Sequence, residues 1–160
     1  MSVNGRIERL ENLIDKLAEI PRYKFSNFIL YKNGRIQLND NKECAVRGCY
    51  LIYQKGKGLP IYIGSNRSQK RKVRGRIRSI FYGRGHPLPY KIVKDLFYKR
   101  SKIKVTTKEV QRNIEEYRKW CFKNLSFKIL EEKNRPLAME IGLIYLFRPK
   151  YNSESKKFSD

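Results

Sequence analysis

The amino-terminal stretch of the chain carries apolar residues at alternating steps of four and three positions. This spacing predicts an amphipathic helix over residues 3–19 that ends before Pro21. We expect the helix to pack against the core of its own domain, because most amphipathic helices do so, with a dimer contact as the alternative. The apolar positions are Val3, Ile7, Leu10, Ile14 and Leu17.

Alternating apolar runs predict two β-hairpins. Residues 25–31 and 35–38 flank an Asn-Gly pair, which is a strong signal for a two-residue hairpin turn. Residues 48–53 and 60–64 are rich in Tyr, Ile and Leu, and a loop of Lys and Gly that can supply positive φ joins them. Because side chains alternate along a strand, one tyrosine of each arm of the second hairpin can approach the other.

The rest of the pattern mixes helices with short strands. It predicts helices at 88–100, 108–123 and 136–147, strands at 102–106 and 125–130, and a helical apolar stripe from Val73 to Phe81. We therefore expect an α/β (α+β) fold with a small, mainly antiparallel three-stranded sheet flanked by helices. Residues 1–45 are assigned to an amino-terminal arm of helix and hairpin, and residues 46–160 to the main domain.

Charge narrows the choice of partner. The 160 residues include 37 Lys and Arg against 15 Asp and Glu, a net charge of +22, and this excess favours a nucleic-acid partner. A membrane is not expected, since no apolar run reaches 18 residues. The basic residues are densest after the second hairpin, and a phosphate-contacting surface is predicted there. Its candidate DNA-binding residues are Lys70, Arg71, Lys72, Arg74, Arg78 and Arg84.

The cysteines and the amino terminus favour a cytoplasmic protein. Cys44, Cys49 and Cys121 are an odd number without paired spacing, which suits a reducing compartment. Residues 1–19 carry charges throughout, so no signal peptide is predicted. Zinc is not expected, because four ligands would need nearly every Cys and the single His.

One acid stands out from its surroundings. The predicted helix 136–147 is apolar nearly all round except for Glu140, so we expect it to be buried on most sides. A lone buried carboxylate costs several kcal/mol unless it is paired or binds a metal. Glu140 therefore needs a cation. From this segment alone, an ion pair with a basic residue and a metal site are equally good explanations.

Three motifs together resemble the GIY-YIG nuclease family. They are Gly48-Cys49-Tyr50 followed by Tyr62-Ile63-Gly64, a basic helix, and Glu140 before Pro149-Lys150-Tyr151-Asn152. Each motif alone is weak, and a strand pair with two tyrosines is a common hairpin. In combination they cover about residues 47–152.

The resemblance implies a metal-dependent DNA endonuclease. In that reading Tyr50 is the general base with Tyr62 beside it, Arg76 stabilises the charge on the phosphate, and Glu140 binds Mg²⁺ or Mn²⁺. The motif does not decide between Arg76 and Arg74, because the distance from Tyr62 is longer than the family pattern.

Several further assignments stay open. His86 is a candidate catalytic group, but a single loop histidine is more often incidental. Ser65 and Asn152 are candidates for phosphate contact or support of the site. The alternative functions are a non-catalytic basic module that binds DNA or RNA, and a nuclease of the Asp…Glu-x-Lys kind built on Asp95 and residues 131–133.

The biological setting is expected from the layout of the sequence. A homing enzyme would add a long recognition domain, whereas this sequence ends eight residues after Asn152, so a compact restriction-type or virus-encoded endonuclease is expected. Cleavage of both strands with one site per chain would require a homodimer or sequential nicking.

Overall fold

The core of the structure is a four-stranded antiparallel sheet in the order β1-β6-β4-β5. The computed structural model describes residues 3–27, 29–32, 35–38, 46–66 and 73–152. The three strands expected from the sequence are β4 (Gly48–Gln54), β5 (Pro60–Ser65) and β6 (Leu125–Glu131). The prediction of three strands was wrong by one, because β1 (Tyr23–Lys24) pairs with the outer edge of β6. Two residues are too short a run for periodicity to reveal.

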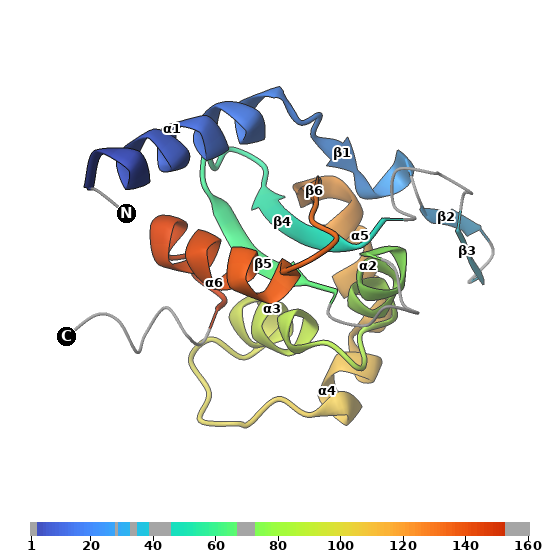
Figure 1. Ribbon diagram of the computed structural model, residues 1–160. Coiled ribbons are helices and arrows are strands. Elements are labelled where there is room, and N and C mark those ends of the chain that lie inside the picture. The colour runs from blue at the N-terminus through green and yellow to red at the C-terminus, as the bar shows by residue number, and fades with distance from the viewer. Residues whose placement is uncertain (1–2, 28, 33–34, 39–45, 67–72, 153–160) are drawn as a thin grey trace.

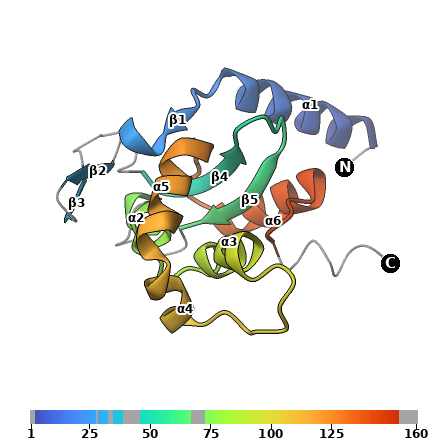
Figure 2. The same cartoon turned by 180° about the vertical axis from the view of Figure 1, so that it is seen from behind.

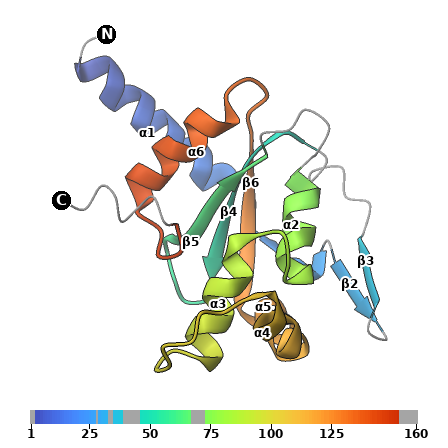
Figure 3. The same ribbon diagram turned by 90° about the horizontal axis from the view of Figure 1, so that it is seen from below.

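Helices cover both faces of the sheet (Figure 1). On one face lie α1 (Val3–Glu19) and α6 (Pro136–Phe147), and on the other α2 (Val73–Tyr82), α3 (Pro87–Phe97) and α5 (Ile114–Asn124). Figure 3 shows this layering with the sheet seen nearly along its edge. Within the described part of the chain, no helix is long and apolar enough to cross a membrane.

The side chains of β4 divide between two cores, as the period of two demands. Tyr50 and Ile52 enter the core beneath α2, α3 and α5, while Leu51 and Tyr53 enter the core beneath α1 and α6. Leu17 joins the second core, so the predicted amino-terminal helix does pack on its own sheet. Every residue from the start of β4 to Tyr53 is buried, because β4 has a strand on each side and helices on both faces.

The first predicted hairpin is also present, but its first arm begins at Ile29 and not at Phe25, because Phe25–Asn27 form a short 3₁₀ helix, η1. The strands β2 (Ile29–Lys32) and β3 (Arg35–Leu38) pair antiparallel, with Lys32 opposite Arg35, as a two-residue connection requires. Asn33 and Gly34 themselves lie outside the described residues. The hairpin lies to one side of the main sheet, at the side away from α1 (Figure 2).

Two sequence predictions about the second half need correction. Residues 102–106 form no strand and pair with none of the described strands. The helix expected over 108–123 is broken at Asn113 into α4 (Thr107–Arg112) and α5. The side-chain Nδ2 of Asn113 donates to the Glu109 carbonyl at 2.8 Å, and this bond competes with the backbone hydrogen bonds of a helix. The predicted capping box of Thr106 and Glu109 does open α4.

The expectation that α6 is buried nearly all round was also wrong. Leu143 and Ile144 are buried against β4 and β5, but the opposite side of the helix carries large exposed apolar residues. These are Leu137, Ile141 and Tyr145. Glu140 lies at the boundary between the two sides and is only partly buried.

The segment after α6 covers the free edge of β5. The backbone N–H of Tyr151 donates to the Ile61 carbonyl at 2.9 Å. Both ends of the Asn152 amide bond to Ile63, accepting from its N–H at 2.8 Å and donating to its carbonyl at 2.7 Å. Because an edge strand otherwise presents unpaired backbone groups, this turn supplies partners to the backbone of Ile61 and Ile63.

We predict that Gly48→Ala destabilises the protein by about 2 kcal/mol, because the added methyl group overlaps backbone atoms that cannot rotate away. A Cβ at Gly48 would meet the Leu130 carbonyl oxygen and would lie 2.8 Å from the Glu132 nitrogen. Urea unfolding measures the effect. The matched control is Gly58→Ala, where a Cβ meets nothing within 4 Å, and it should change stability by less than about 0.5 kcal/mol. Equal losses in the two variants would contradict the packing argument.

Candidate active site

Two tyrosines from neighbouring strands come together as the sequence predicted. Tyr50 of β4 and Tyr62 of β5 have ring centroids 6.3 Å apart. Tyr50 lies opposite Gly64 in the strand register, and its phenol ring passes over that glycine. A Cβ on Gly64 would lie only 2.6 Å from the Tyr50 Cζ. The bare glycine therefore lets the Tyr50 hydroxyl reach across β5.

His86 completes this aromatic group. Its Nε2 lies 2.7 Å from the Tyr50 hydroxyl oxygen, and its ring meets Tyr62 edge-on at 5.1 Å between centroids. Gly83 and Gly85 both have φ of +70°, which few other residues adopt, so the turn between α2 and α3 can bring His86 back over the sheet. His86 is also the N-cap of α3, and its Nδ1 accepts from the Leu88 N–H at 3.2 Å.

These contacts fix the state of the imidazole. Burial lowers the pKa of His86 to about 3, and the charge of Arg76 acts in the same direction, so the ring is neutral at pH 7. Since Nδ1 accepts a hydrogen bond from Leu88, the single proton belongs on Nε2. His86 therefore donates to the Tyr50 oxygen, and the hydroxyl proton of Tyr50 must point elsewhere.

Burial and three neighbouring groups act on the Tyr50 phenol. Burial raises its pKa well above the ordinary value, and Tyr62 and the carboxylate of Glu140 act in the same direction. The guanidinium of Arg76 opposes them and lowers the pKa. Residues from β5, α2 and α6 are thus close enough to one phenol to influence its proton.

Of the two candidate arginines, Arg76 is the one whose charge acts on the Tyr50 phenol. It acts on both Tyr50 and His86, whereas Arg74 does not figure among the causes of either pKa shift. The Arg76 Nε is buried, and among the described residues no acceptor lies within hydrogen-bond distance of it. A buried donor without an acceptor costs about 1–3 kcal/mol, which an incoming oxygen would recover.

Glu140 faces the end of β5. The Ser65 hydroxyl donates a hydrogen bond to its Oε2, so the serine holds the carboxylate in place. Cys49 is also in range of the Glu140 charge, but burial raises the pKa of this thiol to about 12 and its Sγ donates to the Pro136 carbonyl. Cys49 is therefore a protonated packing residue.

This donor set fits a hard divalent cation. It offers the Glu140 carboxylate and neighbouring hydroxyl oxygens, and the nearby thiol remains protonated. In the described part of the chain, no group of three or more His, Cys, Asp or Glu side chains gathers to form a closed metal site. A cation held by one carboxylate would keep its other positions for water and phosphate oxygens, as Mg²⁺ commonly does.

The predicted basic surface is described only in part. Lys70, Arg71 and Lys72 lie outside the described residues. Arg78 and Arg84 border a hollow of about 270 Å³ on the surface of α2 and the turn that follows it. The Arg78 guanidinium lies 5.0 Å from the centroid of the Tyr82 ring, so an aromatic face backs one of these charges.

The structure bears on two other sequence predictions, the role of Asn152 and the Asp…Glu-x-Lys alternative. The Asn152 amide is engaged on both ends with β5, so its place is beneath the site as a support. The elements of the Asp…Glu-x-Lys alternative are separated: Glu131 pairs with Gly48 at one end of β4, whereas Asp95 bonds to Tyr151 near the other end. That arrangement gives no joint site.

Sequence reasoning undervalued His86 and missed the Ser65–Glu140 contact. A histidine in a Gly-Arg-Gly-His-Pro turn has no partner that spacing alone can identify. The usable signal was the proline after it, which is typical of the first turn of a helix and makes His86 an N-cap.

Comparisons with known proteins found two similar solved structures. Neither a protein-family model nor a curated protein sequence matches the chain. The two structures are crystal structures of the GIY-YIG N-terminal endonuclease domain of UvrC from Thermotoga maritima, different point mutants bound to the catalytic divalent cation. Their TM-scores are 0.31 and 0.32, with 24% identity, and each match covers 69% of this chain and 88% of the solved domain. A likeness at this level leaves the assignment of a function to the residues of the chain itself.

The lowered pKa of His86 predicts a loss of stability in mild acid. The unfolded histidine takes up a proton near pH 6.5, while the folded one resists protonation until about pH 3. Because the unfolded state binds more protons between these values, the free energy of unfolding should fall with decreasing pH by up to about 1.4 kcal/mol per pH unit.

Urea unfolding measured at several pH values between 6.5 and 5 tests this prediction. Most carboxylates titrate below that range. The comparison is His86→Asn, which retains an N-cap acceptor for Leu88 but has no group that titrates in this range. Its stability should depend less on pH than that of the wild type. Parallel pH profiles would show that His86 is protonated normally in the folded protein.

Proposed function

We propose that the chain is a divalent-metal-dependent DNA endonuclease that hydrolyses phosphodiester bonds. The observation that carries the proposal is the convergence of Tyr62, Arg76 and Glu140 on the buried phenol of Tyr50. These residues come from distant segments, and the convergence unites a hydroxyl, a permanent cation and a carboxylate. Hydrolysis of a phosphodiester needs a base for water, a donor for the phosphate oxygens and a divalent ion.

In this proposal Tyr50 accepts a proton from the attacking water. The Nε2–H of His86 donates to the Tyr50 oxygen and would favour the phenolate form that can act as a base. Arg76 lowers the pKa of the phenol further. Without an added positive charge the buried phenol stays protonated at neutral pH, so the protein alone holds the base in an inactive state.

Arg76 and Glu140 act on the phosphate side. The unpartnered Nε of Arg76 would donate to an oxygen on which charge develops in the transition state. Glu140, held by Ser65, would be the protein ligand of Mg²⁺ or Mn²⁺. When bound, the metal ion supplies positive charge near the leaving oxygen and the phenol.

The partner is DNA in this proposal, and the net charge of +22 supports a polyanionic substrate. A restriction-type or virus-encoded origin, a cytoplasmic location and a homodimer remain predictions from the sequence. The division into an arm over 1–45 and a domain over 46–160 remains one as well. The competing function is a basic module that binds nucleic acid without cutting it, and the next experiment separates the two.

Replacing the proposed metal ligand should abolish cleavage. We expect Glu140→Gln to lower the Mg²⁺-dependent nicking of supercoiled plasmid at least about 100-fold, because an amide is a poor ligand for a hard cation. The control is Glu131→Gln, which removes a half-exposed carboxylate at the end of β6 and should cut normally. Cleavage by wild type that persists in EDTA, or full activity of Glu140→Gln, would refute the metal role. No cleavage by wild type would favour the binding module.

The choice of arginine can be tested with charge-preserving substitutions. Arg76→Lys should lower the cleavage rate about 100-fold or more, because lysine lacks the planar set of donors that can bond two phosphate oxygens. Arg74→Lys, two residues away on the same helix, should stay within a few-fold of wild type. Single-turnover rates on a labelled duplex measure both. The reverse order of the two effects would assign the role to Arg74.

A further inference from the structure

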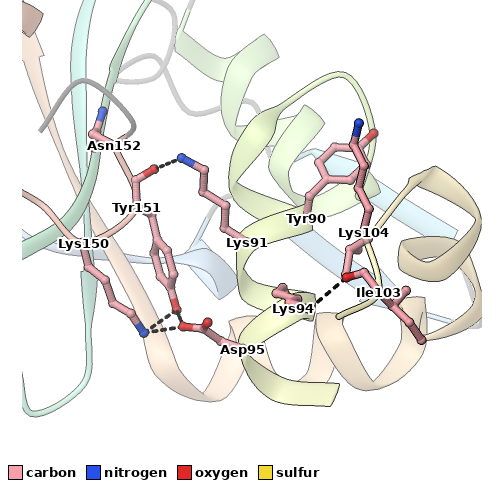
Figure 4. A pocket seen from close by; sticks show the side chains of 10 residues that line it. Tyr90, Lys91, Lys94, Asp95, Ile103, Lys104, Lys150, Tyr151 and Asn152 are labelled. Carbon is pink, nitrogen blue, oxygen red and sulfur yellow. Dashed lines mark hydrogen bonds and ion pairs between the residues drawn. The ribbon is translucent and has the colours of Figure 1, made fainter. Parts of the chain in front are cut away.

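A second hollow lies beside the proposed active site. It has a volume of about 800 Å³ and opens between α3, the loop that follows it and the turn after α6 (Figure 4). This size is in the range of pockets that hold small organic ligands. We call this hollow the α3 pocket. Its lining includes Tyr90, Lys91, Lys94, Ile103, Lys104 and Tyr151.

The lining of the α3 pocket is strongly positive. Four lysines and a single carboxylate, Asp95, border it, which leaves an excess of three positive charges. The carboxylate is occupied, because Lys150 forms an ion pair with it and the Tyr151 hydroxyl donates to it at 2.7 Å. An anionic ligand would therefore meet lysine ammonium groups without competition from a free acid in the lining.

The pocket also has apolar walls that a purely electrostatic surface would not need. Ile103 is 51% exposed at its border, although it is a large aliphatic side chain, and Val105 and Tyr90 are partly buried beside it. The Tyr90 hydroxyl bonds to Thr107 at 3.0 Å, which holds the ring against the loop. Apolar and aromatic surface next to positive charge is the combination that takes a nucleobase together with its phosphate.

The loop that forms one wall is held in place from α3. The Lys94 ammonium donates to the carbonyl oxygens of Ser101 and Ile103, at 2.5 and 2.8 Å. Lys91 likewise donates to the Tyr151 carbonyl at 2.5 Å, which ties the opposite wall to the same helix (Figure 4). The hollow is thus a built feature of the fold with two anchored walls.

The α3 pocket and the proposed active site share their supports. His86 caps the helix whose residues 90–95 line the pocket, and at 1.5 Å per residue the two lie roughly 6–14 Å apart along α3. Asn152, which borders the pocket, is bonded on both ends to β5 beside Tyr62. A strand that crosses the active site can therefore reach the pocket within a few nucleotides.

We propose that the α3 pocket holds one unstacked nucleotide of a DNA strand, near the phosphate that is cut. Its phosphate would be bound by Lys104, with the charges of Lys91 and Lys94 on α3 adding attraction, and its base would lie against Ile103 and Tyr90. The choice of DNA as the ligand rests on the proposed function, because a free nucleotide carries the same chemical groups and would fit the same walls. It assigns the α3 pocket to substrate binding, and a binding experiment without cleavage can test it.

The test uses the full chain with the Glu140→Gln substitution in EDTA, so that DNA binds without being cut. The probe is a short fluorescein-labelled oligothymidine, and anisotropy gives its Kd at several salt concentrations. We compare Lys104→Ala, in the pocket, with Lys102→Ala, an exposed lysine of the same loop outside the pocket. Both remove one charge from one loop, so non-specific attraction falls equally.

The expected result is a difference between these two lysines. Lys104→Ala should raise Kd about fivefold or more and lower the slope of log Kd against log salt by about one, while Lys102→Ala leaves Kd within about twofold. Ile103→Ala should raise Kd about fivefold without changing the slope, because it removes apolar contact and no charge. An oligonucleotide carrying 5-iodouracil should cross-link to Tyr90.

Two results would overturn the proposal. Equal effects of the two lysine substitutions would show that the pocket is not used, and thymidine monophosphate competing as well as the oligonucleotide would assign it to a free nucleotide. Plasmid cleavage by the wild type reports separately on the proposed function. If the wild type cleaves plasmid but the two lysine substitutions raise Kd equally, only the role of the α3 pocket is rejected. If the two substitutions differ but the wild type does not cleave, only the nuclease function is rejected.

Discussion

The hydrogen bond between His86 and Tyr50 is the contact on which the rest of the site depends. It joins the centre of the sheet to the start of α3 across a glycine that leaves room for the phenol. Because both side chains are buried, the Nε2–H of His86 needs an acceptor, and the Tyr50 oxygen supplies it. The position of α3, and with it the walls of the α3 pocket, is thereby fixed relative to β4.

The sequence predicted those parts of the fold that have a regular period or a local chemical signal. The strands β4, β5 and β6, the first helix, the Asn-Gly hairpin and the Thr106 capping box all follow from spacing of a few residues. The two glycines of the tyrosine motifs were recognised by resemblance, and the structure gives their physical reason. Gly48 lies against the backbone of β6, and Gly64 lies beneath the Tyr50 ring.

The failures share a different cause, which is that they depend on tertiary partners. Lys102 to Thr106 alternate like a strand, but a strand exists only where another strand offers hydrogen bonds. The apolar composition of α6 predicted burial on all sides, yet a helix on the outer face of a sheet is covered on one side alone. For His86 and Ser65, periodicity indicated neither partner, because Tyr50 is 36 residues from His86 and Glu140 is 75 from Ser65.

Electrostatics explains why a neutral histidine is used at this place in so basic a protein. Arg76 stands close enough to lower the pKa of His86 further than burial alone does, so a second cation beside it would be repelled. A neutral imidazole with its proton on Nε2 can donate to the phenol without adding charge to the active site. The Tyr50 oxygen then receives a hydrogen bond from one side and the field of Arg76 from another, and both favour the phenolate. Burial and Glu140 raise the pKa of Tyr50 and so favour the protonated phenol. An added positive charge nearby would therefore shift the phenol toward the phenolate.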